Sequence, residues 1–217
     1  MVSGTDLFLG LFNNLALFIV LVAVYGFLID VVDQSSVSAR QALIGLSFGL
    51  FAIACMHAKI PVADGVIVDQ RNTIVTLGGA FGGPLSAMVS AFIAASYRLY
   101  LGGAGAFGGV VGLGLSALAG AVLYKFRGKI DSVAKALFSA LAATIFILPG
   151  FLFFEDLQTG WNLLKSMALP YGSAVFIGIF FVGLLLARQE HSHHAKVELV
   201  KSERRLRRVA MQRIANP

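Results

Sequence analysis

The sequence has little charge and almost no cysteine. Only 13% of its 217 residues are charged and 58% are hydrophobic, whereas a water-soluble domain carries about 25% charged residues. This composition excludes a soluble globular protein and indicates an integral membrane protein. The single cysteine, Cys55, excludes an internal disulfide, and its apolar surroundings favour a packed thiol over a reactive one.

The sequence also lacks the residue groupings that catalysis and metal binding need. No nucleophile–base pair, metal cluster or phosphate loop stands at a workable spacing, so we expect this chain to have no enzymatic activity and no cofactor or metal. His57 has no second ligand nearby in the sequence. The group His191, His193 and His194 could bind a metal, but a solvated segment beside the membrane is the favoured interpretation.

The positive charge is concentrated at the C-terminus. Residues 188–217 carry eight Lys or Arg against three Asp or Glu, while residues 1–187 carry nine against eight. The basic tail therefore indicates a cytoplasmic C-terminus rather than nucleic-acid binding. We expect residues 1–187 to form a transmembrane domain and residues 188–217 a cytoplasmic signalling helix.

The apolar runs predict an all-α polytopic membrane protein with six to seven hydrophobic segments. Asn14 near the start of the first segment could bond across helices or lie at the interface, Pro149 should kink the sixth segment, and Trp161 and Tyr171 resemble interfacial anchors in an outer loop that begins at Glu155. The predicted segments are Leu7–Ile29, Ala42–Met56, Thr73–Gly83, Pro84–Tyr100, Ala106–Tyr124, Val133–Phe154 and Ala168–Ala187.

The stretch from 69 to 105 organises the prediction. Arg71 and Arg98 stand at the ends of an uncharged run that contains Gly82-Gly83-Pro84, a combination that ends one helix and starts another. A straight helix would separate the arginines by roughly 40 Å. A re-entrant break would return both to one membrane surface, as in broken helices that line a binding site.

Two topologies follow from this stretch. With the break there are seven segments, the 57–72 loop faces outward, and the 125–135 loop and the tail are cytoplasmic. With one long kinked helix there are six segments and Arg71 lies inside. The break chemistry favours the first scheme.

Two arginines that face one site would favour a bound carboxylate through charge-assisted hydrogen bonds. Two alternatives are open. Asp64 and Asp69 could neutralise the arginines permanently, and the glycines near the break could serve helix packing alone.

The tail pattern favours a dimer. Leu199, Leu206 and Val209 are spaced by seven and three residues with charges between them, as in a helix that pairs with a second copy. We therefore expect a homodimer through the C-terminal helix, in a protein that otherwise contacts the lipid bilayer.

Three motifs together, DQRN, LGGAFGGPLSA and SYRLYLGGAGA, resemble the core of the LytS-type five-transmembrane sensor domain of bacterial histidine kinases and diguanylate cyclases. The resemblance covers roughly residues 35–187. The tail KSERRLRRVAMQRIANP looks like the lead-in to a PAS domain, which we expect to follow directly. The resemblance implies a receptor in the bacterial inner membrane.

In family members that sense pyruvate, two arginines meet the ligand, and they match Arg71 and Arg98. A cysteine and a serine also meet it, and Gly109 and Gly112 stand at those positions, so we expect a roomier pocket. The predicted binding residues are Arg71, Arg98, Asn72, Gly102, Gly103, Gly109 and Gly112.

The leading functional hypothesis is a ligand-sensing input domain that binds a small organic anion and signals to a PAS and a kinase or cyclase output. The alternative is a small-molecule transporter or a vitamin-uptake substrate-binding subunit, because small-residue helices would suit either. The signalling helix favours the sensor.

Overall fold

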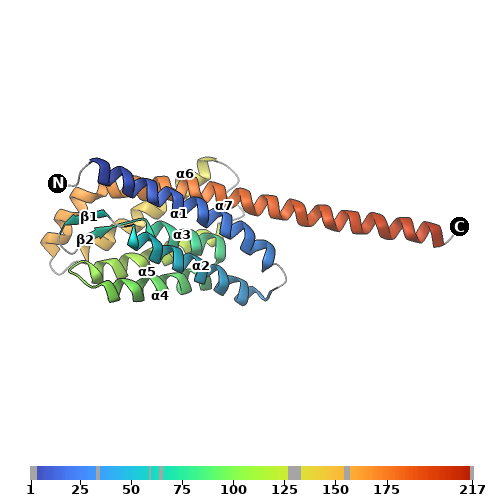
Figure 1. Cartoon of the computed structure of the whole chain (residues 1–217), viewed down its shortest axis with the longest axis horizontal. Helices are drawn as coiled ribbons and strands as arrows, with labels where there is room; N and C mark the ends of the chain where they lie inside the picture. The colour runs from blue at the N-terminus through green and yellow to red at the C-terminus, as the bar shows by residue number, and fades with distance from the viewer. Residues whose placement is uncertain are drawn as a thin grey trace.

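The computed structural model describes residues 4–32, 35–58, 60–63, 66–126, 133–153 and 157–215. These residues form seven α-helices, which alternate in direction and make one bundle from which the last helix projects (Figure 1). The helices are α1 (Gly4–Val31), α2 (Val37–His57), α3 (Arg71–Gly82), α4 (Pro84–Leu101), α5 (Ala106–Lys125), α6 (Val133–Ile147) and α7 (Leu157–Ala215).

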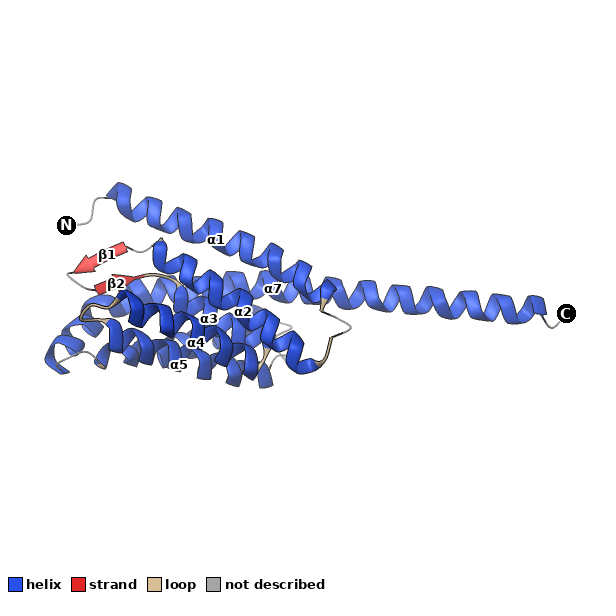
Figure 2. Cartoon of the chain, turned by 60° about the horizontal axis from the view of Figure 1, so that its bottom comes forward, coloured by secondary structure: helices blue, strands red, loops and turns tan. Residues whose placement is uncertain are grey.

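The remaining elements are short. Strands β1 (Ile60–Ala63) and β2 (Val66–Val68) pair antiparallel at the end of the bundle opposite the projecting part of α7 (Figure 2). The expected kink near Pro149 is present as a 3-10 helix, η2 (Leu148–Leu152), which follows α6. The all-α prediction is thus confirmed, with one small hairpin in the loop between α2 and α3.

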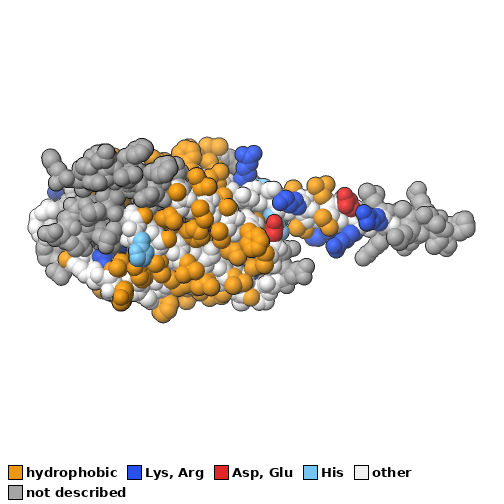
Figure 3. Space-filling view, in the orientation of Figure 1, with side chains coloured by type: hydrophobic (Ala, Val, Ile, Leu, Met, Phe, Trp, Pro, Cys, Tyr) orange, Lys and Arg blue, Asp and Glu red, His pale blue; other side chains and the backbone are white. Residues whose placement is uncertain are grey.

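Three helical stretches in the described part of the chain are long and apolar enough to cross a membrane: Val37–His57, Ala106–Lys125 and Tyr171–Arg205. Apolar side chains spread over the face of the bundle seen in Figure 3. Phe92, Phe107 and Ile145 are large apolar residues that are each more than half exposed. A soluble protein rarely exposes such a continuous apolar surface. The chain is a multi-pass membrane protein.

The predicted helix break is confirmed at Gly83. Its φ of 97° is readily available only to glycine, and Pro84 occupies the first position of α4, where its missing N–H costs nothing. The side chain of Gln41 supports the break from α2, since its Oε1 accepts a hydrogen bond from the backbone N–H of Leu85 at 3.2 Å. The six-segment alternative with one continuous helix is therefore wrong.

Helix α3 is the centre of the bundle, and all twelve of its residues are buried. It can sit there because glycines let the backbones of α3 and α5 approach. A Cβ placed on Gly120 would lie 2.9 Å from the Cα of Gly79 and would overlap the carbonyl oxygen of Thr76. The glycines of this segment therefore do serve close helix packing, as small residues do in membrane helices.

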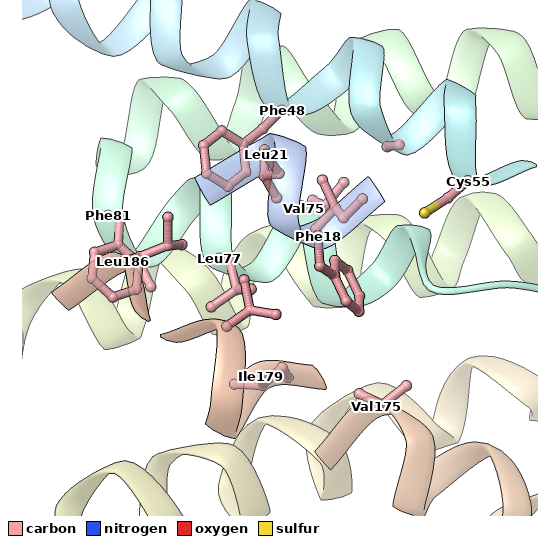
Figure 4. Packing of buried hydrophobic residues seen from close by; sticks show 14 of the residues in the cluster. Phe18, Leu21, Phe48, Cys55, Val75, Leu77, Phe81, Val175, Ile179 and Leu186 are labelled. Atoms are coloured by element: carbon pink, nitrogen blue, oxygen red, sulfur yellow. The ribbon is translucent and has the colours of Figure 1, made fainter. Parts of the chain in front are cut away.

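The core around α3 is apolar. Phe48 and Leu77 are among its buried side chains (Figure 4), as is Leu186 of α7. Two polar groups meet at its edge, where the Sγ of Cys55 donates to the Oδ1 of Asn14 at 3.6 Å. Cys55 is fully buried, so the prediction of a packed thiol and the inter-helix interpretation of Asn14 are confirmed.

The expected outer loop is wrong beyond residue 156. Helix α7 already begins at Leu157 and runs for 59 residues without interruption. Trp161 is 46% exposed, as an interfacial anchor would be, whereas Tyr171 is only 6% exposed and contacts α3 instead. The buried phenol has a hydrogen-bond partner on α3 that its position in the sequence does not indicate.

Some predictions concern residues, or side chains, that the structure does not describe. Asp64 and the basic residues Arg127 and Lys129 lie outside the described residues, as do the side chains of Leu206 and Val209. Leu199, the first residue of the proposed dimer stripe, is 65% exposed. Dimerisation through the tail stays a prediction.

Candidate ligand-binding site

Arg71 and Arg98 converge on one point of α5. Arg71 is the first residue of α3, and Arg98 lies in the last turn of α4, so the break at Gly83 returns both to the end of the bundle that carries the hairpin. A Cβ placed on Gly109 would lie 3.0 Å from the Nη2 of Arg71 and 3.0 Å from the Nε of Arg98. The Nη2 of Arg71 and the Nε of Arg98 are therefore separated by no more than twice this 3.0 Å.

The two arginines differ in how their charge is balanced. The Nη1 of Arg71 donates to the Oδ2 of Asp69 at 2.8 Å, and the same carboxylate accepts the backbone N–H of Arg71 at 3.0 Å. Arg98 is 2% exposed and donates its Nη1 to the carbonyl oxygen of Gly102. Among the described residues it has no carboxylate partner, so these three charged groups leave one positive charge uncompensated.

Each arginine also has an unused donor. The Nε atoms of Arg71 and Arg98 are buried and have no hydrogen-bond partner. A buried donor without a partner costs about 1–3 kcal/mol, and more when the group is charged. In both side chains Nη1 has a protein partner, which leaves Nε, together with Nη2, as the edge that can receive a planar carboxylate in two parallel hydrogen bonds.

Asn72 continues the site along α5. Its Nδ2 donates to the hydroxyl of Tyr171 at 2.7 Å, and its Oδ1 is buried without a partner. A Cβ placed on Gly112 would lie 3.3 Å from the Nδ2 and 3.9 Å from the Oδ1. Gly109 and Gly112 are three residues apart on one helix, so the arginines and Asn72 face the same side of α5.

The comparisons with known proteins agree on one family. The family model described as 5TMR of 5TMR-LYT matches residues 25–189. The chain belongs to this family. It is similar to the sensor protein LytS of Staphylococcus haemolyticus (strain JCSC1435), at 27% identity over 61% of this chain and 27% of that protein. No solved structure matched the chain.

A second relative is the sensor protein LytS of Staphylococcus saprophyticus subsp. saprophyticus, which is 27% identical over 54% of this chain and 21% of its own length. The matched region thus spans only about a quarter of either relative. Membership of the 5TMR-LYT family makes this chain a transmembrane sensor input domain of a signalling receptor.

All seven residues predicted for the site lie at this end of the bundle, with the glycines in two roles. Gly102 and Gly103 have φ angles of 64° and 88°, and their turn places the carbonyl oxygen of Gly102 against Arg98. Gly109 and Gly112 are the bare face of α5. The space at Gly109 is occupied by guanidinium groups rather than left open, so the expected roomier pocket is not found there.

Two residues of the site were not among those predicted to bind. The sequence predicts Asp69 only as a neutralising partner, and it pairs with Arg71 but not with Arg98. For Tyr171 the sequence predicts a place at the membrane interface. Its ring packs edge-on against Phe151 with centroids 5.3 Å apart. Its hydrogen bond to Asn72 spans 99 residues of sequence, and so distant a contact leaves no local signal.

The donors at this site are guanidinium, amide and phenol groups, which suit an anion rather than a metal. Among the residues that the structure describes, no three His, Cys, Asp or Glu side chains gather in a way that could hold a metal ion.

Proposed function

We propose that this chain is the ligand-binding input domain of a bacterial receptor and that its ligand is a small organic anion bound through a carboxylate by Arg71 and Arg98. The observation that supports this is the convergence of the two guanidinium edges on Gly109, where Asp69 is the one carboxylate that pairs with them among the residues the structure describes. An unpaired buried charge is costly. A ligand carboxylate would offset that cost and satisfy both unused Nε donors.

In this proposal residues 1–187 form the sensor in the cytoplasmic membrane, with the hairpin end outside. Residues 188–217 form a cytoplasmic signalling helix that pairs with a second copy and leads to an output region such as a PAS domain followed by a kinase or a diguanylate cyclase. The family assignment and the length of α7 favour this sensor over the transporter alternative.

The test is isothermal titration calorimetry of the purified chain in lipid nanodiscs against a panel of small carboxylates that includes pyruvate. We expect Arg71→Ala and Arg98→Ala each to weaken binding by about 2–5 kcal/mol, the cost of removing one partner of a buried charge pair. This corresponds to roughly 30-fold to several thousand-fold in affinity. Lysine at either position should restore only part of it, because an ammonium group cannot form the planar fork.

Arg40→Ala is the matched control. Arg40 lies near the start of α2, at the opposite end of that helix from the hairpin, so its removal lowers the charge of the chain equally without touching the site. Equal carboxylate affinity in all three alanine variants would show that Arg71 and Arg98 are structural and would refute the proposal.

A further inference from the structure

The site offers donors at one end and an acceptor at the other. The unused atoms of Arg71 and Arg98 are N–H groups, whereas the unused atom of Asn72 is a carbonyl oxygen. We propose that the ligand is a small hydroxy carboxylate, such as a 2-hydroxy acid, and that Asn72, oriented by Tyr171, selects it over the corresponding oxo acid. This inference rests on the proposed function and specifies its ligand.

The spacing of the two ends suits a short ligand. Positions three residues apart on a helix have Cβ atoms about 5–6 Å apart, so the points beside Gly109 and Gly112 are separated by about that length. A carboxylate against the arginine edges therefore places a substituent on its second or third carbon beside Asn72. In a ligand with a longer carbon chain, the polar group would lie beyond the amide of Asn72.

Tyr171 binds one of the two polar atoms of the Asn72 amide. Its hydroxyl accepts the Nδ2 hydrogen bond at 2.7 Å, and the buried ring is held edge-on by Phe151. With Nδ2 bonded there, Oδ1 is the amide atom without a partner, and it lies 3.9 Å from where a Cβ on Gly112 would be. The hydroxyl of Ser116, four residues beyond Gly112 on α5, already donates to the carbonyl oxygen of Gly112 at 2.7 Å.

A ligand hydroxyl would satisfy Oδ1, because it can donate a proton. An oxo group would place a second acceptor against it, and an apolar substituent would leave Oδ1 buried and unpaired. Leaving a buried acceptor unpaired is penalised much more than the average hydrogen bond is rewarded. The site should therefore rank ligands of equal size by the group on the second carbon.

The experiment compares lactate, pyruvate and propionate, which share a carboxylate and three carbons and differ only at the second carbon. Calorimetry of the wild-type chain in nanodiscs should show lactate binding roughly 5- to 100-fold more tightly than either of the others. Equal affinities, or tighter binding of pyruvate, would overturn the inference and leave the proposed anion site intact. Failure of all three to bind would overturn the inference alone, because the anion site is tested separately by the wider carboxylate panel and the arginine variants.

Two variants separate selectivity from folding. Asn72→Leu should bring the three affinities to within about twofold while propionate still binds, because the arginines are unchanged. Tyr171→Phe should let the amide turn, so that the lactate-to-pyruvate ratio falls while Arg98-dependent binding persists. If the lactate-to-pyruvate affinity ratio is unchanged in both variants, Asn72 and Tyr171 do not determine which ligand binds. The wild-type ranking does not depend on either variant folding.

Discussion

Gly109 offers the sharpest perturbation of the proposed site, because one added methyl group reaches both arginines. In Gly109→Ala the new Cβ would lie 3.0 Å from the Nη2 of Arg71 and from the Nε of Arg98, and 3.3 Å from the Cγ of Arg98. These contacts are too close by a few tenths of an ångström, so the side chains must shift. Arg71 is tied to Asp69 and Arg98 to Gly102, so neither guanidinium can withdraw without weakening that bond.

The expected effect is on binding rather than on folding. Losing one charge-assisted hydrogen bond costs about 1.5–3 kcal/mol, so carboxylate affinity should fall by roughly 10- to 150-fold. Replacing glycine by alanine inside a helix favours the helix by up to about 1 kcal/mol, which offsets part of the weakened guanidinium bond, so the melting temperature should change little. A variant that is equally stable but binds poorly is the expected result.

Gly114→Ala is the matched control on the same helix, because a Cβ there would meet no atom within 4 Å. It gains the same helix propensity and leaves the arginines untouched. The measurements are calorimetric affinity for the carboxylate that binds the wild-type chain best and thermal unfolding in nanodiscs. If Gly109→Ala and Gly114→Ala bind that carboxylate equally well, the guanidinium edges beside α5 do not hold it.

Three further predictions concern the fold. In a Cys55→Ala background, a cysteine at Thr159 should react with an impermeant thiol reagent in intact cells and one at Ser35 only after lysis; the reverse pattern would invert the proposed orientation. Gln41→Leu should lower the stability by about 1 kcal/mol, since Leu85 loses its side-chain acceptor at the break, and an unchanged melting temperature would show that the break needs no support from α2. Single cysteines along 196–214 should form disulfides between copies with helical periodicity, and a complete absence of cross-links in membranes would count against the dimer.

The convergence of the arginines could be predicted because its cause is local. Two glycines followed by proline cannot continue a helix, and the segments on either side fix where Arg71 and Arg98 return. The hydrophobic runs likewise predicted the helices. An apolar segment in lipid must satisfy its own backbone hydrogen bonds, and a helix does so whatever its neighbours are.

What the sequence did not reveal depends on contacts between distant segments. Asn72 belonged to the predicted site, but its partner Tyr171 lies on a helix whose start was placed eleven residues too late, because polar residues between 157 and 167 resemble a loop. Likewise, the bare face of α5 suggested open space, whereas two guanidinium groups from other helices occupy it at Gly109. Such long-range placement follows from the packing of the whole bundle.

The continuity of α7 links the site to the tail in mechanical terms. Tyr171 bonds to Asn72 at one end of the membrane stretch, and at the other end α1 holds α7 through Tyr25, which donates to Glu190 at 2.6 Å, and through Asp30, which lies 2.6 Å from the Nδ1 of His193. About 30 Å of unbroken helix separates these two regions. Since no glycine-proline break interrupts α7 there, a displacement of Tyr171 cannot be absorbed by a hinge of the kind that divides α3 from α4. It must either be resisted by the contacts with α1 or passed as a shift or rotation to the residues beyond 193, where the charged part of the helix leaves the bundle.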